Sequence, residues 1–334
     1  MNEASANALV MSGGGARGAF EVGVVDYLVH DHGLDFDVIT GVSVGALNAA
    51  MLAQADGADE LAAQVDVLKD LYFGIRSYRD VFLKRGIARL LELPADLDHL
   101  LSGIGSHAIY DPTPLRRLVD RHLDAERLHR ARRDLRVGVV SLDRGDYVSA
   151  SGHDPDIKHF VLASTAIPWI FPPVRVRGER YIDGGTRNIA PLGDAFDGLA
   201  LLDSDLDRAK RMFVVLSTPR HLPHVQGERD LIDLLERSVD IMMAGVTHHD
   251  LEHARQINDG LHLARERGWD REALAERGLD WLAGKVEAEL VVFEPEVPPV
   301  GLLDFDPEGI REAFTAGRHV AQRVMTTGSP GAEK

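Results

Sequence analysis

Ser43 stands between two glycines in FDVITGVSVGALNAAMLA, residues 36–53, where a short apolar strand is followed by an apolar helix. The residues 41–45 match G-x-S-x-G, in which the flanking glycines permit a sharp strand-to-helix turn that exposes the serine hydroxyl. A serine hydroxyl is weakly acidic and needs a positioned proton acceptor to act as a nucleophile. The pattern therefore predicts a nucleophilic serine, with an ordinary serine at a helix N-terminus as the alternative.

A glycine-rich segment, GGGARG at residues 13–18, lies between another predicted strand and helix. It matches G-x-G-x-x-G, and backbone N–H groups at a helix N-terminus suit a phosphate or another developing anion. A dinucleotide site would need an acidic residue at the end of the next strand, where Ile39, Thr40 and Gly41 stand. No Lys-Ser/Thr pair follows the glycines. A nucleotide site is therefore not supported, and a tight turn remains the simplest alternative.

A histidine cluster, HHDLEH at residues 248–253, contains the H-x-x-E-H arrangement of His249, Glu252 and His253. Two histidines four residues apart on a helix lie on one face and can share a zinc ion, as in inverted zinc peptidases. No distant acidic residue is singled out as a third ligand. Helix histidines that bond to neighbours or water are the ordinary case, so a metallopeptidase is kept only as an alternative.

Four stretches occur in order along the chain, and their joint occurrence is far more specific than any one of them. They are GGGARG, GVSVG, LASTAIPWIFPPV at residues 162–174 and DGGTRNIAP at residues 183–191. With these motifs the chain resembles the patatin-like phospholipases, or lipid acyl hydrolases. YDPTPLRRLV, residues 110–119, is similar to the bacterial branch of that family.

The resemblance implies a catalytic dyad without a histidine, in which Ser43 is the nucleophile and Asp183 its base. Backbone N–H groups of Gly13, Gly14 and Gly15 would form the oxyanion hole. The implied reaction is hydrolysis of a lipid or related acyl ester through an acyl-serine intermediate, with no metal and no organic cofactor. Transfer of the acyl group to another acceptor stays open, as does a non-catalytic lipid-binding or regulatory module on the same fold.

Three further residues are candidates for substrate contacts. Arg17 follows the glycines where the family often carries a basic residue, and it is expected to steady the loop, to meet a phosphate head group or to form a solvent-exposed salt bridge. Trp169 and Phe171 are candidates for lining an acyl-chain pocket, with a place in the core as the simpler interpretation.

The order of the elements predicts an α/β protein with three layers and a mostly parallel central sheet. Strand-turn-helix units at the N-terminus favour parallel pairing, and hairpins are expected around residues 143–145 and 178–179. Further strands are expected in RMFVVLST and AELVVFEP, with helices over about 228–263, about 270–285 and from Pro307, capped by Asp306. We expect one patatin-like domain over residues 1–325, a helical cap at about 59–106 and a loose tail at 326–334.

The charge and the amino-acid composition of the chain argue against several classes of binding partner. The 334 residues carry 37 basic and 53 acidic side chains, a formal net charge of -16, which argues against nucleic acid and against a polybasic attachment to anionic lipid. There is no cysteine, and thus no disulfide or thiolate metal site. Because we find neither a signal peptide nor a membrane span, we expect a cytoplasmic protein. Peripheral contact with membranes and the oligomeric state stay open.

Overall fold

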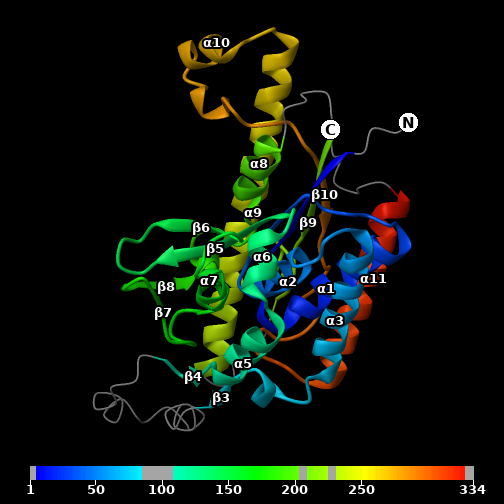
Figure 1. Cartoon of the computed structure of the whole chain (residues 1–334), viewed down its shortest axis with the longest axis vertical. Coiled ribbons are helices and arrows are strands. Elements are labelled where there is room, and N and C mark those ends of the chain that lie inside the picture. The colour runs from blue at the N-terminus through cyan, green and yellow to red at the C-terminus, as the bar shows by residue number, and fades with distance from the viewer. Residues whose placement is uncertain (1–4, 85–107, 203–208, 225–230, 328–334) are drawn as a thin grey trace.

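The computed structural model describes residues 5–84, 108–202, 209–224 and 231–327, which are built around an eight-stranded sheet (Figure 1). The strand order is β10-β9-β1-β2-β5-β8-β7, and β6 pairs with β5 from outside this path. The strands are β1 (Ala6–Met11), β2 (Val38–Val42), β5 (Asp134–Ser141), β6 (Tyr147–Ser151), β7 (Val174–Val176), β8 (Glu179–Asp183), β9 (Lys210–Val215) and β10 (Glu289–Phe293).

Five neighbouring strands, from β10 to β5, are parallel, whereas β6, β7 and β8 add antiparallel pairs. Both predicted hairpins, β5–β6 and β7–β8, are confirmed. In the central register Met11 of β1 pairs with Gly41 of β2. The carboxyl ends of β1 and β2 therefore meet at one edge of the sheet, where ligands bind in open α/β sheets.

Helices cover both faces of the sheet, which confirms the three-layer prediction (Figure 1). One face carries α1 (Gly18–Asp26), α2 (Val44–Ala53), α3 (Ala58–Gly74), α7 (Ile157–Ser164) and α11 (Pro307–Thr327), and the other carries α8 (Leu192–Leu201). The long helix α9 (Leu231–Glu266) contributes to both cores, with Val239 and Met243 in the first and Leu251 and Ile257 in the second. Strand residues alternate between the two cores: Leu9 and Met11 face the first, and Ala8 and Val10 the second. This two-residue period divides the apolar residues of each buried strand between the layers.

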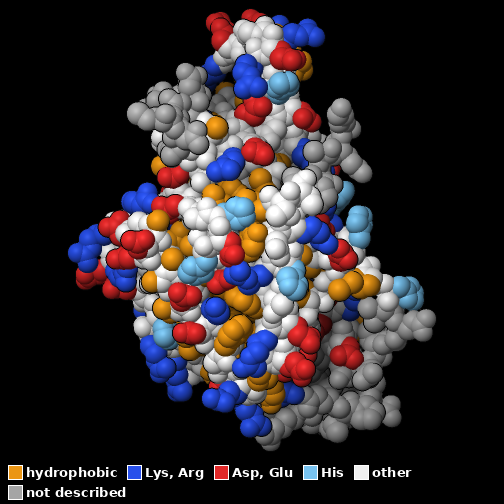
Figure 2. Space-filling model, turned by 90° about the vertical axis from the view of Figure 1, so that its right-hand side faces the viewer, with side chains coloured by type: hydrophobic (Ala, Val, Ile, Leu, Met, Phe, Trp, Pro, Cys, Tyr) orange, Lys and Arg blue, Asp and Glu red, His pale blue; other side chains and the backbone are white. Residues whose placement is uncertain are grey.

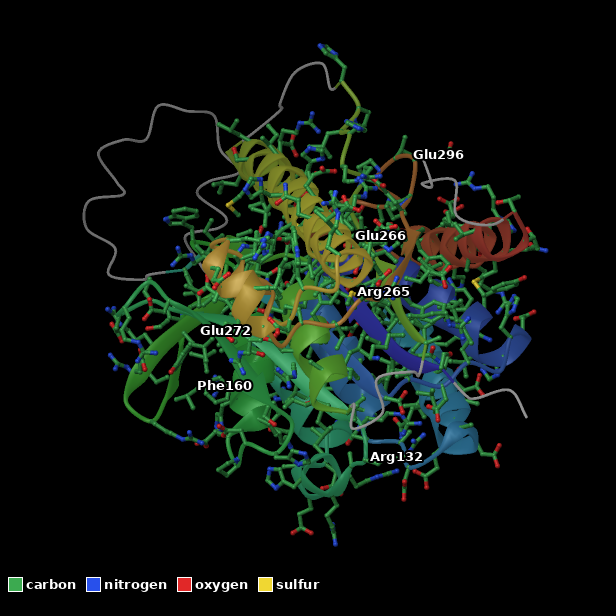
Figure 3. The ribbon with its side chains drawn as sticks, turned by 90° about the horizontal axis from the view of Figure 1, so that it is seen from above. Arg132, Phe160, Arg265, Glu266, Glu272 and Glu296 are labelled. Carbon is green, nitrogen blue, oxygen red and sulfur yellow. The ribbon has the colours of Figure 1, made fainter. Side chains whose placement is uncertain are left out.

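The C-terminal half agrees with the prediction except in one helix. The helix expected over about 270–285 is limited to α10 (Arg271–Glu276), because Gly278 adopts a positive φ of 67° just beyond it. Asp306 caps α11, accepting hydrogen bonds from the N–H groups of Glu308 and Gly309. Figure 3 looks down on the molecule, with Arg265 and Glu266 at the C-terminal end of α9. None of the described helices combines the length and hydropathy that a membrane span requires.

The segment predicted as a helical cap begins with α3, which packs against α1, α2 and α11 within the helical layer. After α3, β3 (Leu83–Lys84) pairs antiparallel with β4 (Tyr110–Asp111), and α5 (Thr113–His122) and α6 (Ala125–Arg130) follow. The rest of the predicted cap, residues 85–107, lies outside the described residues. Helix α11 extends to Thr327, two residues into the predicted tail, and residues 328–334 lie outside the described part of the chain.

Candidate active site

Ser43 occupies the turn between β2 and α2 with φ 57° and ψ −129°, a strained conformation for a residue with a side chain. The two neighbouring glycines make the turn sterically possible. A Cβ at Gly41 would lie 2.3 Å from the Gly45 carbonyl oxygen, and one at Gly45 would lie 2.4 Å from the Met11 carbonyl oxygen. The G-x-S-x-G pattern thus produces the sharp strand-to-helix turn that was predicted.

Ser164, which sequence analysis did not select, holds the backbone of this turn. The Ser43 N–H donates to Ser164 Oγ at 2.8 Å, and Ser164 Oγ donates to the Gly138 carbonyl at 2.6 Å. Both groups are buried. The side chain of Ser164 thus ties the nucleophile turn to β5. Its position in LASTAIPWIFPPV was the only signal in the sequence.

Asp183 at the end of β8 lies near Ser43 at the end of β2, because both strands flank β5 in the sheet. Burial raises the pKa of Asp183 to about 7, and the Ser43 side chain and the Gly185 N–H offset part of this rise. The Gly185 N–H donates to Asp183 Oδ1 at 2.8 Å. Ser43 and Asp183 also line one small cavity of about 20 Å³, together with Gly14. The structure therefore brings the two predicted dyad residues together and makes the carboxylate more basic than usual.

The glycine loop differs in part from the prediction. The Gly13 N–H donates to the Ile189 carbonyl at 3.2 Å, so it is already used and cannot serve as an oxyanion donor. Within the described residues, no hydrogen bond uses the N–H of Gly14 or Gly15. The loop passes close to the nucleophile, since a Cβ built on Gly13 would lie 3.1 Å from Ser43 Cβ. Of the three N–H groups that the sequence predicts as oxyanion donors, those of Gly14 and Gly15 therefore remain as candidates.

Arg17 is buried, with 2% of its surface exposed, so the expectation of a solvent-exposed salt bridge is wrong. Its guanidinium forms a bidentate pair with Asp240 at 2.6 and 3.0 Å. It also donates to Thr218 Oγ1 and to the Val300 carbonyl, both at 2.9 Å. These bonds fasten the glycine loop to α9, which agrees with the loop-steadying role, and Arg17 does not line the small cavity that contains Ser43 and Asp183.

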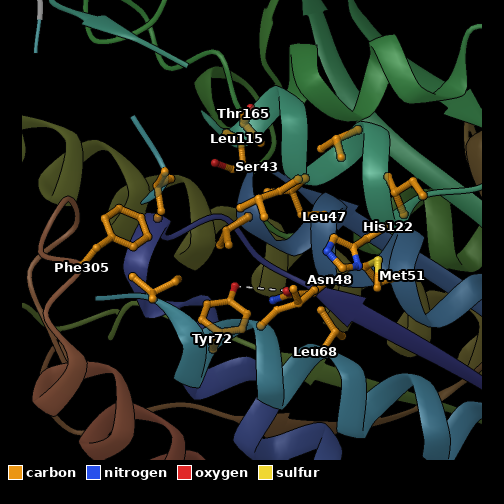
Figure 4. A pocket seen from close by; sticks show the side chains of 18 of the residues that line it. Ser43, Leu47, Asn48, Met51, Leu68, Tyr72, Leu115, His122, Thr165 and Phe305 are labelled. Carbon is orange, nitrogen blue, oxygen red and sulfur yellow. Dashed lines mark hydrogen bonds between the residues drawn. The ribbon is translucent and has the colours of Figure 1, made fainter. Parts of the chain in front are cut away.

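A second, larger cavity of about 130 Å³ starts at Ser43 and has almost entirely apolar walls (Figure 4). Residues from α2, α3 and α5 line it, including Leu47, Met51, Leu68 and Leu115. Asn48 and Tyr72 hydrogen-bond to each other in its wall at 3.1 Å, which satisfies both polar groups. The cavity offers apolar surface to a hydrocarbon chain beside the nucleophile.

Phe171 and Trp169 differ in burial, although they are only two residues apart. Phe171 is buried in the first core and also lines the apolar cavity. Trp169 is 70% exposed and lines neither cavity, so both its predicted place in a pocket and the simpler core interpretation are wrong. A positive φ of 65° at Trp169 accompanies this exposed position.

A buried carboxyl group missed by the sequence lies beneath the glycine loop. Burial raises the pKa of Glu21 well above its usual value, and hydrogen bonds from Asn48 and Ser12 oppose that rise. Asn48 Nδ2 donates to Glu21 at 2.9 Å, and Ser12 Oγ contacts its other oxygen at 3.4 Å. Glu21 therefore connects α2 to the end of β1, next to the glycines.

The histidine cluster does not assemble into a metal centre in the described part of the chain. His249 and His253 are exposed on α9, and His253 stacks on Trp281 with ring centroids 5.8 Å apart. Glu252 forms an ion pair with Arg255 at 2.7 Å. The described residues do gather Asp26, His30 and Asp66 in one potential metal-ligating group, but none of the H-x-x-E-H residues belongs to it.

Comparison with known proteins gives a solved structure and a family model that match this chain. Among solved structures, the chain is similar to the crystal structure of VipD from Legionella pneumophila, with 14% sequence identity and a TM-score of 0.42. The matched region covers 96% of this chain and 67% of the VipD chain. A similarity of that size carries no argument. The family model for patatin-like phospholipases, in contrast, matches residues 9–196, which are more than half of the chain and include the glycine loop, Ser43 and Asp183. The chain therefore belongs to the patatin-like phospholipase family.

Proposed function

We propose that the protein hydrolyses acyl esters of lipids with Ser43 as nucleophile and Asp183 as general base. The observation that carries this proposal is the strained turn that holds Ser43 beside a buried carboxyl group whose pKa is raised to about 7. A base of that pKa is well matched to work at neutral pH. Family membership indicates a hydrolase of lipid esters, and the residue roles are our inference from this geometry.

In the first half of the reaction, Ser43 Oγ attacks the ester carbonyl carbon while its proton passes to Asp183. The carbonyl π electrons move to the oxygen, and in this proposal the N–H groups of Gly14 and Gly15 stabilise that charge. The tetrahedral intermediate then expels the alcohol, which takes the proton from Asp183. An acyl group remains on Ser43.

In the second half, a water molecule attacks the acyl-serine and gives its proton to Asp183. Collapse of the second tetrahedral intermediate releases the carboxylic acid, and the proton held by Asp183 returns to Ser43 Oγ. Asp183 alternates between base and acid in both halves, so the scheme does not require a histidine. No titratable imidazole lines the small cavity with Ser43 among the described residues.

The apolar cavity is the proposed site for the acyl chain. It begins at Ser43, and its walls between α2, α3 and α5 carry aliphatic and aromatic side chains. Burial of each CH₂ contributes about 0.8 kcal/mol, so a longer chain gains affinity until the cavity is filled. We therefore expect long-chain esters to be favoured over acetate esters.

Hydrolysis of a series of acyl esters by the wild-type protein, Ser43→Ala and Asp183→Asn tests the proposal. Each substitution should reduce kcat by at least ~10³, and the double variant should be little worse, because the two residues act as a unit. Ser151→Ala, which changes an exposed serine, is the matched control and should retain full activity. Activity that survives in Ser43→Ala, or strictly additive losses, would refute the dyad.

A further inference from the structure

One end of the molecule carries β3, β4 and α5 (Figure 1), and large apolar side chains are exposed there. Trp169 is 70% and Leu83 43% exposed. Three backbone segments lie side by side there: Leu83 pairs with Asp111 across the β3–β4 ladder, and the Ile109 N–H donates to the Trp169 carbonyl at 3.1 Å. Leu83 and Trp169 therefore flank the same strand.

Trp169 is held outward by its backbone. A positive φ is a genuine outlier for a bulky residue and costs free energy, and Trp169 has a φ of 65°. Its neighbours Ile167 and Pro168 line the small cavity with Ser43, and Phe171 lines the apolar cavity. One short loop thus contributes side chains to both cavities and presents a tryptophan to the outside.

Four exposed arginines lie on the segments next to β3 and β4: Arg76 and Arg79 lie after α3, and Arg116 and Arg117 lie on α5, whose Leu115 N–H donates to the Val81 carbonyl. None of them forms an ion pair with any residue that the structure describes. The docking face is defined here as these four arginines together with Leu83 and Trp169. Figure 2 shows Lys and Arg side chains interspersed with hydrophobic ones along the lower edge, the end that carries β3, β4 and α5 in Figure 1.

Of the acidic residues near the docking face, Asp80 and Asp111 accept local capping bonds, and Asp120 on α5 forms an ion pair with Lys158 at 3.8 Å. Asp80 accepts from the N–H groups of Arg76 and Ser77, at 2.8 and 3.2 Å. Asp111 accepts from the N–H and the hydroxyl of Thr113 at the start of α5, at 2.9 and 2.7 Å. The arginine guanidinium groups consequently remain available to an external anion, although the whole chain has a net charge of -16.

The docking face is the outer side of the apolar cavity wall. Ile75 and Leu115 line the cavity, and each directly precedes an arginine of the face. On α5, Leu115, Leu118 and Val119 line the cavity, whereas Arg116 and Arg117 are exposed. A partner bound at this face would lie next to the proposed acyl-chain site.

We propose that the docking face binds the surface of an anionic phospholipid bilayer, with Trp169 and Leu83 in the headgroup region and the four arginines on lipid phosphates. Tryptophan favours this boundary because its ring is apolar and its N–H is polar. Each basic side chain near an anionic bilayer strengthens binding, and added salt screens this attraction. This inference rests on the proposed function, because the bilayer would supply the lipid substrate. Its test, however, measures membrane binding alone.

The test is sedimentation of the full chain with vesicles of phosphatidylcholine, with and without phosphatidylglycerol. We expect binding to the anionic vesicles, weakened by added salt, and a loss of ~10-fold or more in partitioning for Arg116→Gln/Arg117→Gln. Arg267→Gln/Arg271→Gln is the matched control, because these exposed arginines lie at the far end, where α9 passes into α10, and it should bind as the wild type does. Trp169→Ala should also weaken binding.

A second measurement follows Trp169 directly in a variant with Trp269→Phe and Trp281→Phe, which leaves it as the sole tryptophan. Its fluorescence should shift to shorter wavelength on anionic vesicles. Equal binding by the two double-arginine variants, or an unshifted spectrum in a vesicle-bound sample, would overturn the docking face. If the protein binds vesicles through the docking face but has no esterase activity, the docking face stands and the proposed function is refuted. If it has esterase activity but its vesicle binding does not depend on the docking face, only the docking face is refuted.

Discussion

Arg17 in the glycine loop and Asp240 on α9 form a buried bidentate ion pair, with nitrogen–oxygen distances of 2.6 and 3.0 Å. The two residues lie 223 positions apart, and α9 is outside residues 9–196. A helix beyond the family match therefore fastens the loop that carries the proposed oxyanion donors.

Asp240→Ala should reduce both the free energy of unfolding and kcat, because it leaves a buried guanidinium without its partner. Loss of one member of a buried ion pair typically costs about 3–5 kcal/mol. Denaturant unfolding and ester hydrolysis measure the two effects. As a control, Arg127→Ala breaks an exposed pair with Glu60 and should cost less than about 1 kcal/mol. A similar cost for both variants would contradict the clamping role of Asp240.

Ser164→Ala should lower kcat by roughly 10-fold to 10²-fold with little change in KM, because the Ser43 N–H loses its acceptor and the nucleophile turn relaxes. Ser164→Thr keeps the hydroxyl and should recover part of the loss. Steady-state kinetics on a soluble ester separate kcat from KM. If Ser164→Thr were as poor as Ser164→Ala, side-chain volume rather than the hydrogen bond would be the cause.

Gly14→Ala should lower kcat by ~10² or more, since an added methyl group displaces the proposed oxyanion donors. Its Cβ would lie 1.9 Å from Ser217 Oγ and 2.8 Å from Ser217 Cβ. Ser217→Gly in the same chain removes both atoms and should restore part of the rate. Circular dichroism checks that the variants fold. An active Gly14→Ala single variant would mean that this glycine does not position a donor.

The local features of the site could be predicted from the sequence because each depends on a few consecutive residues. The turn at Ser43 follows from its two glycines, and Asp183 ends a strand of a recognisable hairpin. The buried partners of the site could not be predicted. Arg17 pairs with Asp240 and Ser43 with Ser164 only after the sheet brings distant segments together.

Two errors show where short patterns mislead. The three glycines look equivalent in sequence, but only the tertiary position of Ile189 shows that the Gly13 N–H is already bonded. The sequence predicts Trp169 in an acyl-chain pocket or in the core. Its positive φ, which no sequence pattern announces for a tryptophan, turns it outward instead.

The pH dependence of activity should follow the titration of the Asp183 carboxyl group. Burial raises its pKa to about 7, so the carboxylate that accepts the serine proton predominates only above that pH. kcat/KM should therefore rise through pH 7 and level off above it, and a pH–rate profile on a soluble ester measures this. An inflection near pH 4, the usual value for an aspartate, would contradict the buried base.

The same raised pKa should also make the fold less stable as pH rises. Between about pH 4 and 7 the native state keeps a proton that the unfolded chain releases, so the free energy of unfolding falls across this window. Asp183→Asn should weaken this dependence, because only the other buried carboxyl groups with a raised pKa, such as Glu21 and Glu236, still contribute to it, and it should be more stable than the wild type above pH 7. Urea unfolding at several pH values provides the measurement, and equal slopes for both proteins would exclude the effect.

Covalent labelling by a fluorophosphonate tests the central claim most directly, because the reagent reacts only with an activated serine and its phosphonyl oxygen takes the place of the oxyanion. The account predicts one label per chain, located on Ser43 by peptide mass spectrometry, with its rate rising through pH 7. Labelling should be abolished in Ser43→Ala and reduced by at least ~10² in Asp183→Asn. A label on another residue, or an undiminished rate in Asp183→Asn, would contradict a Ser43–Asp183 dyad.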